Sequence, residues 1–174
     1  ARYLRVGEQG LQFDLAQGRE SGSSFGFARR TRASDTIRMP YLEHGSAGVG
    51  TVALRYLAVT RRPVYAAFAE RIRSSVAHKY AVIPGLFSGL AGLGNYLLDA
   101  HQLLQDPGYL ALAHRTAQGI RLFRMPRGEG MAFPGLDQGK LTCDYAEGSA
   151  GIGLFLHRLL HGSGNFNFML DETL

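Results

Sequence analysis

The sequence contains a single cysteine, Cys143, among its 174 residues. One thiol excludes both an intrachain disulfide and a metal site built from several cysteines, and we expect Cys143 to be buried as a small apolar side chain. No apolar run approaches the roughly 18 residues that a membrane-spanning helix needs, and no signal-peptide pattern is present. These absences predict a cytoplasmic protein without a membrane partner.

Positively charged residues are in modest excess. Lysine and arginine number 19 against 14 acidic residues, which gives a net charge of +5. The cations fall in short groups, for instance within residues 29–38 and at Arg61 and Arg62. Such an excess favours an acidic partner, but no nucleic-acid-binding motif accompanies it, so we expect no nucleic acid partner. A solvated basic face and a docking surface for an acidic peptide are the two interpretations that remain.

Glycine is abundant, with 23 residues, and it recurs in an ordered pattern. The hexad Gly-x-x-Gly-x-Gly occupies residues 45–50, 89–94 and 148–153, and each copy leads into an apolar stretch with helical spacing. Residues 63–78 and 107–123, between the hexads, also show helical spacing. The repeat therefore predicts a mainly α fold in which each glycine turn starts an inner helix and an outer helix follows.

The hexads invite a functional interpretation as well as a structural one. Glycine lets two backbones approach closely, and free amides at a helix N-terminus suit an anion. A nucleotide site is excluded because the order of the glycines is wrong for a dinucleotide loop and the phosphate-loop lysine is absent.

Two segments depart from the helical pattern. Residues 2–6 and 11–15 alternate around a Gly-rich centre, which predicts a β-hairpin. Residues 130–133 and 140–145 predict a second one around Pro134-Gly135. Residues 18–36 are rich in Gly, Ser and Arg and indicate a mobile loop. We therefore expect a hairpin and loop over residues 1–36, followed by helical repeats over residues 37–174.

Four runs carry a family resemblance: residues 39–48, 84–92, 131–135 and 144–151. They resemble the last repeats of lanthionine synthetase C-like cyclases, closest to the C-terminal cyclase of class III lanthipeptide synthetases, over residues 37–160. The resemblance implies a partial α/α toroid with one or two short β-hairpins. It implies Michael addition of cysteine thiols to dehydroalanine or dehydrobutyrine, which forms (methyl)lanthionine or labionin rings in a precursor peptide. Upstream kinase and lyase domains are the other implied partners.

The chain has fewer repeats than the closed toroid of that family and begins with Ala1 rather than methionine. We therefore expect it to be part of a larger synthetase. A second copy that closes the ring, as a homodimer, is the alternative.

The family's zinc ligands are not matched. Zinc-dependent members place a cysteine two residues before the first of these glycines and Cys-His directly before the second. This chain has Glu43 at the first position and Phe87-Ser88 at the second. Because a tetrahedral zinc site needs three or four protein ligands, the resemblance implies no metal and no cofactor here. ATP and Mg²⁺ are expected only for the upstream kinase domain.

The resemblance and the glycine turns together select the candidate catalytic residues. His44, at the first glycine turn, is the candidate base or acid, with turn capping as the alternative. Glu43 would orient the His44 side chain, with an ordinary surface charge as the alternative. Asp144 would face the same active-site opening as His44, with capping of a helix N-terminus as the alternative. Tyr80 would donate a hydrogen bond to an enolate oxygen, with a place at an ordinary helix end as the alternative. The expected substrate-binding residues are Gly45, Gly48, Ser88, Gly89, Gly92, Glu147 and Gly148.

Ring closure without metal is chemically feasible. A thiol with a pKa of about 8.5 costs about 2 kcal/mol to deprotonate at neutral pH, which a nearby base can supply. A cluster of His44 with Glu43, Asp144 or Tyr80 would favour catalysis, whereas scattered positions would favour a module that only binds the precursor peptide. A carbohydrate-active toroid with paired carboxylates is a third hypothesis. His157 and His161 fit a solvated helix face.

Overall fold

A computed structural model describes residues 2–22, 24–30, 35–137 and 140–162. It is mainly helical, as predicted. The helices are α1 (Arg2–Gln17), α2 (Ser46–Thr60), α3 (Pro63–Arg71), α4 (Arg73–Val76), α5 (Leu90–Leu104), α6 (Pro107–Ile120) and α7 (Ser149–His161). A 3-10 turn at Arg121–Phe123 extends α6. No helix of this described part is long and apolar enough to cross a membrane.

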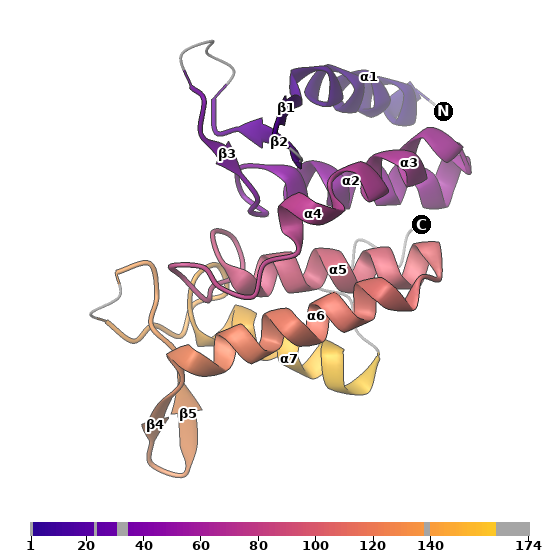
Figure 1. Ribbon diagram of the computed structural model, residues 1–174. Coiled ribbons are helices and arrows are strands. Elements are labelled where there is room, and N and C mark those ends of the chain that lie inside the picture. Colours follow the sequence, from indigo (N-terminus) through magenta and orange to yellow (C-terminus); the bar gives the residue numbers. More distant parts are fainter. Residues whose placement is uncertain (1, 23, 31–34, 138–139, 163–174) are drawn as a thin grey trace.

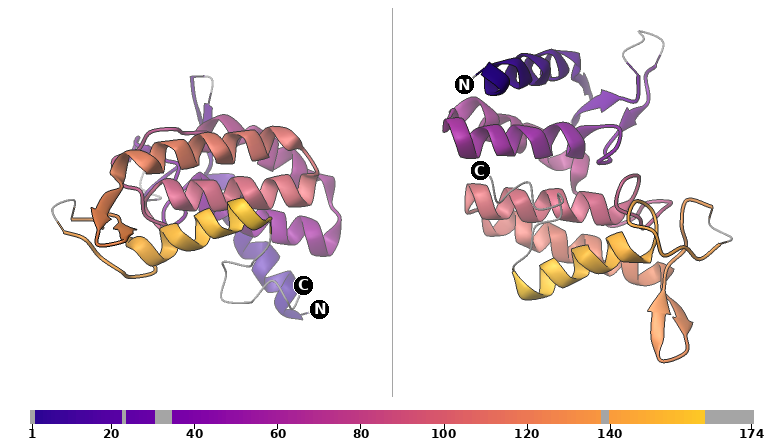
Figure 2. Two further views of the ribbon diagram at one scale, coloured as in Figure 1. Left: turned by 90° about the horizontal axis from the view of Figure 1, so that it is seen from below. Right: turned by 180° about the vertical axis from the view of Figure 1, so that it is seen from behind.

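The helices form layers that follow one another along the chain (Figure 1). The three helices that begin at the glycine hexads are α2, α5 and α7, and α5 lies between the other two. Every residue from Leu90 to Ala100 in α5 is buried, so this helix is the centre of the core. The outer helices α3 and α6 pack on α2 and α5 respectively, an order that the view from behind also shows (Figure 2).

The same turn leads from each inner helix to its outer helix. Arg61 after α2 and Gln105 after α5 both have left-handed backbone, with φ of 57° and 56°. Each outer helix then starts on a proline, whose fixed φ and missing N–H suit a first helical position. The predicted helices over residues 63–78 and 107–123 are thus confirmed, with a break at Ile72 that separates α3 from α4.

Two glycines allow the inner helices to pack closely. A methyl group at Gly50 would overlap the ring of Tyr96 on the next inner helix, and one at Gly94 would overlap the ring of Phe155. Gly153, at the equivalent position of the third hexad, is exposed, and a methyl group there would meet no described atom within 4 Å. The described residues therefore form an open stack in which the inner helices follow one another. They do not close into a toroid.

The predicted N-terminal hairpin is wrong, because residues 2–17 form α1. Leu4, Glu8 and Leu11 lie at helical spacing on the side that faces α2 and α3. Tyr56 donates to the Leu4 carbonyl at 3.0 Å, Arg62 pairs with Glu8, and Leu11 is buried. The alternation of apolar and polar residues over residues 2–15 is short enough to fit a helical period of 3.6 residues as well. Packing against α2 favours the helix.

The predicted mobile loop over residues 18–36 is wrong in part, since strands occupy much of it. β1 (Arg19–Ser21), β2 (Ser24–Ala28) and β3 (Arg38–Met39) form an antiparallel sheet in that order. Phe25 and Phe27 of β2 are buried edge-to-face against Phe68, and this packing orders the segment. Residues 31–34 lie outside the described part of the chain.

The second hairpin has a different partner strand from the predicted one. β4 (Met125–Arg127) pairs with β5 (Gly130–Ala132) around Gly128, whose φ is 54°. The predicted pairing of residues 130–133 with 140–145 is reduced to a single bridge between Pro134 and Leu141. Gly128 supplies the left-handed turn that a short hairpin needs, whereas Pro134 lacks the N–H for a continued ladder.

Candidate functional site

The three glycine loops lie side by side because backbone hydrogen bonds join them. The amide of Glu43 donates to the Phe87 carbonyl at 2.9 Å, and the amide of Phe87 donates to the Ala146 carbonyl at 2.9 Å. These three residues occupy the same register, two positions before the first glycine of each hexad. Equivalent positions of three segments far apart in the sequence are therefore neighbours.

Each loop folds back over the first turn of its own helix. The amides of Ala47, Ala91 and Ser149 donate to carbonyls seven residues earlier, at 2.9, 3.0 and 2.9 Å. The chain's own carbonyls thus accept from these N-terminal amides, which are therefore not free to bind an anion.

The close approach of loop and helix explains the second glycine of each hexad. A methyl group at Gly48, Gly92 or Gly151 would overlap the carbonyl oxygen six residues earlier. Gly89, Gly92 and Gly148 are buried, whereas Gly45 and Gly48 are half-buried. The structure gives these glycines a shaping role, and their contact with a substrate stays a prediction.

A row of polar side chains crosses the loops just before the hexads. His44 Nδ1 lies 3.2 Å from Glu43 Oε2, and Ser88 Oγ donates to the same Glu43 oxygen at 2.9 Å. Ser88 also contacts Glu147 on the third loop. We call these four residues, Glu43, His44, Ser88 and Glu147, the polar row. His44 and Glu43 are 35% and 46% exposed, so the row is open to a ligand.

The surroundings of Glu147 perturb its ionisation. Burial raises the pKa of its carboxyl, the negative charge of Glu43 adds to this, and polar contacts with Ser88 partly oppose it. Gly85 lies directly against the Glu147 side chain, with no room for a methyl group. Glu147 Oε2 is buried and has no hydrogen-bond partner within the described ranges. The protonated form of this carboxyl is therefore favoured at a higher pH than is usual for glutamate.

The predicted catalytic residues Asp144 and Tyr80 lie outside the polar row. Asp144 Oδ1 accepts the amide of Glu147 at 2.8 Å, and this hydrogen bond is the main cause of its lowered pKa. Asp144 thus holds the loop that presents Glu147. Tyr80 is 65% exposed and its ring stacks under the Lys79 ammonium at 5.3 Å. Across the described ranges, no hydrogen bond or ion pair joins either side chain to His44.

The residues at the family's zinc positions do not fit a zinc site. Phe87 offers no ligand atom and packs edge-to-face on Tyr145 at 6.1 Å, while Glu43 and Ser88 bond to each other. Within the part of the chain that the structure describes, no three His, Cys, Asp or Glu side chains are grouped as metal ligands. His157 and His161 lie on the exposed face of α7.

Cys143 is exposed, so the expectation of a buried cysteine is wrong. It precedes Asp144 in the segment that leads to α7.

The link between Ser88 and the two glutamates is not evident from the sequence. All four residues of the polar row are among the predicted site residues. The prediction, however, gives Ser88 and Glu147 a role in substrate binding and gives Glu43 and His44 a role in catalysis. The common register offers the signal, since His44, Ser88 and Glu147 each directly precede the first glycine of a hexad. A repeat that stacks in register places such residues in one line.

Comparison with known proteins gives one partial relationship. No protein-family model matches the chain. The chain is 31% identical over 113 residues, or 65% of its length, to a probable SapB synthase of Streptomyces coelicolor. The match spans 12% of the length of that protein, so the chain corresponds to a small part of its relative.

Proposed function

We propose that this chain is the zinc-independent cyclase part of a lanthipeptide synthetase. It closes thioether rings by adding cysteine thiols to dehydroalanine or dehydrobutyrine in a precursor peptide. The likeness to a probable SapB synthase supports a role in lanthipeptide biosynthesis. The observation that carries the cyclase proposal is the polar row, in which an exposed histidine contacts a carboxylate beside a second, protonatable carboxyl.

His44 is the proposed base. Its contact with Glu43 favours the tautomer with the proton on Nδ1, which leaves Nε2 free to accept the thiol proton. The thiolate sulfur then forms a bond to the β-carbon of the dehydro residue. The electron pair of the C=C bond moves towards the α-carbon and the adjacent carbonyl oxygen, giving an enolate.

Glu147 is the proposed acid. Its raised pKa extends the pH range over which the carboxyl holds a proton, and that proton passes to the α-carbon. His44 then releases its Nε2 proton to solvent, and Glu147 takes up a proton from solvent in place of the one it gave to the α-carbon. The row thereby ends the cycle in its starting state, and the net reaction adds S–H across the double bond.

The test replaces His44 by alanine in the synthetase that contains this chain. A dehydrated precursor peptide is incubated with the enzyme, and free cysteines are counted by thiol alkylation and mass spectrometry. We expect dehydration to proceed and ring closure to slow about 100-fold or more, the usual contribution of a general base. His157→Ala, on the exposed face of α7, is the matched control and should close rings at the normal rate.

The competing function is a module that binds the precursor peptide without catalysing ring closure. If His44→Ala closes rings as fast as the unmutated enzyme, His44 has no catalytic role and the binding function is the better account. Slowed closure with unchanged affinity for the peptide supports the cyclase and contradicts mere binding.

A further inference from the structure

Ser88 lies between the two carboxyl groups of the polar row. Its hydroxyl donates to Glu43 Oε2 at 2.9 Å, and the same Glu43 oxygen lies 3.2 Å from His44 Nδ1. On the other side, the hydroxyl and the backbone amide of Ser88 both contact the Glu147 carboxyl. Ser88 thus connects the proposed acid, Glu147, with the residue that orients the proposed base.

The Ser88 hydroxyl cannot donate to both carboxyl groups at once, because it carries a single hydrogen. While it donates to Glu43, its oxygen lone pairs are what remains for Glu147, and lone pairs suit a protonated carboxyl that acts as the donor. An ionised Glu147 would instead compete for the hydroxyl hydrogen, since hydrogen bonds to a charged acceptor are the stronger kind. The direction of the hydroxyl therefore depends on whether Glu147 holds its proton.

Exposure to water decides that competition. Glu43 is 46% exposed, so water can replace Ser88 as its donor. Glu147 is half-buried, and its Oε2 is packed against Gly85 without a hydrogen-bond partner within the described ranges. The charged side chains that act on Glu147 in the described part of the chain, Glu43 and Asp144, are both acidic and offer it no donor. An ionised Glu147 therefore gains more from the Ser88 hydroxyl than Glu43 loses.

We propose that Ser88 is a positioning residue for ring closure, whose hydroxyl donates to Glu43 while Glu147 is protonated and turns to Glu147 when that proton passes to the α-carbon. In the first state Ser88 helps to hold Glu43 against His44. In the second state it stabilises the new carboxylate, which favours the proton transfer. A hydrogen bond changes its acceptor, and no covalent bond to Ser88 forms or breaks. This role rests on the proposed function, in which Glu147 is the acid.

Titration of Glu147 in the full chain tests the contact without any ring closure. The glutamate side chains are labelled with carbon-13, their carboxyl signals are followed by NMR as the pH is changed, and the Glu147 signal is identified by its loss in Glu147→Gln. We expect the pKa of Glu147 to rise further in Ser88→Ala, because the ionised form loses a donor. In Ser88→Thr, which keeps the hydroxyl, the pKa should match that of the native chain.

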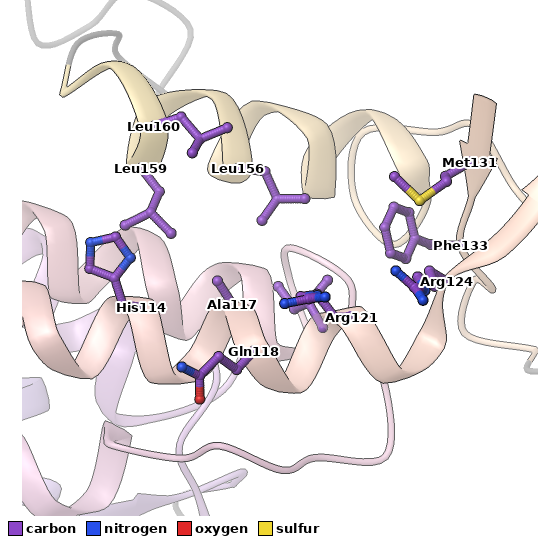
Figure 3. Close-up of a pocket in the computed structure, with 11 residues that line it drawn as sticks. His114, Ala117, Gln118, Arg121, Arg124, Met131, Phe133, Leu156, Leu159 and Leu160 are labelled. Carbon is purple, nitrogen blue, oxygen red and sulfur yellow. The ribbon is translucent and has the colours of Figure 1, made fainter. Parts of the chain in front are cut away.

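Two substitutions away from the polar row serve as controls for this titration. Ser74→Ala removes a hydroxyl at an exposed position of α4. Gln118→Ala removes an exposed side chain that lines the pocket of about 420 Å³ between α6 and α7 (Figure 3). None of the described residues that line this pocket belongs to the polar row. Both variants should therefore leave the pKa of Glu147 unchanged.

Ring closure is measured next, in the synthetase that contains this chain and with the dehydrated precursor peptide. Ser88→Ala should slow closure about tenfold, the effect of losing one hydrogen bond to a charged group. Its affinity for the peptide should stay unchanged, and Ser88→Thr should restore the rate. Ser74→Ala should close rings as fast as the unmutated enzyme.

The results separate a failure of this role from a failure of the proposed function. An unchanged or lowered Glu147 pKa in Ser88→Ala overturns the contact, and so does a shift of equal size in Ser88→Thr, whatever His44→Ala does to ring closure. If His44→Ala slows closure and Ser88→Ala does not, Ser88 has no positioning role and the cyclase function stands. If His44→Ala closes rings normally, the proposed function fails, and the role of Ser88 in ring closure fails with it.

Discussion

Glu147 shows how a single side chain in the polar row responds to its surroundings. Its pKa is raised above the ordinary glutamate value, chiefly by burial, so the ionised form is disfavoured in the folded chain. The folded state therefore holds the proton more tightly than the unfolded state does. The stability associated with this group is fully present below the unfolded pKa of about 4.3 and declines as the pH rises through the folded pKa.

Glu147→Gln removes the charge and keeps the shape. We expect the variant to be more stable than the native chain at pH 7 to 8, by less than about 1 kcal/mol because Glu147 is only half-buried and water screens the charge. The difference should shrink towards zero near pH 4. Thermal unfolding followed by circular dichroism across this range measures it. Glu129→Gln, on the exposed turn between β4 and β5, is the control, and a gain independent of pH would contradict the assignment.

Residue roles can be predicted from the sequence where neighbours in the chain decide them. His44 beside Glu43 is such a case, since adjacent residues at a turn readily meet. The contacts of Ser88 with Glu43 and of Asp144 with the Glu147 amide depend on how loops stack. The exposure of Cys143 depends on which side of its loop faces the core, which no local pattern records.

At the scale of helices, the third glycines of two hexads, Gly94 and Gly153, have different surroundings, and alanine substitutions at them should therefore have opposite effects on stability. Gly94 of α5 faces the ring of Phe155, whereas a methyl group at Gly153 of α7 would meet no described atom. Alanine favours a helix over glycine by up to about 1 kcal/mol where nothing obstructs its methyl group. Gly153→Ala should therefore stabilise the chain by about that amount.

The matched substitution Gly94→Ala should destabilise the chain by about 1–3 kcal/mol, because overpacking forces the two helices apart. Urea unfolding of both variants separates the effects by sign. Equal effects at the two glycines would mean that α5 and α7 are not packed as described, or that a further element covers Gly153.

Helix positions follow from the sequence because glycine turns and prolines mark their ends so clearly. α1 is not predictable in the same way, because residues 2–15 are short and weakly apolar, so a period of 2 and a period of 3.6 fit nearly equally. The contact of Glu8 with Tyr65 and Arg62, 54 or more residues away, decides between them. β2 escapes prediction because Phe25 and Phe27 lie between Gly and Ser residues that locally favour a loop.

At the scale of the whole molecule, the repeat predicts which helices are inner ones but not how they are coupled. Asp99 of α5 is 2% exposed and accepts from Arg55 of α2 and from Arg158 of α7. Arg158 also donates to Asn95 at 3.3 Å. Repeats in a stack contact their neighbours, and here one carboxylate on the middle inner helix joins both of its neighbours. Arg55, Asp99 and Arg158 each stand ten residues after the first glycine of a hexad, so the repeat marks the positions although it does not say that their side chains pair.

Asp99→Ala should therefore be among the most destabilising single substitutions in the chain. It leaves two largely buried guanidinium groups without their shared carboxylate, and breaking a buried pair in this way costs about 3–5 kcal/mol. Asp137→Ala, which removes an exposed pair with Lys140 at 3.0 Å, should cost less than about 1 kcal/mol. Both are measured as free energies of unfolding in urea.

Replacing Asp99 together with both arginines distinguishes lost attraction from the cost of buried cations that have lost their shared carboxylate. The cost of Asp99→Ala can come from the two buried cations that lose their shared carboxylate. In that case the triple variant Asp99→Leu/Arg55→Leu/Arg158→Met should recover most of the lost stability, because apolar side chains of similar volume often replace buried ion pairs without loss. If the triple variant is as unstable as the single one, α2, α5 and α7 depend on the ion pairs themselves for their arrangement. The glycine loops that carry the polar row begin these same helices, so that second outcome would also predict slower ring closure in the triple variant.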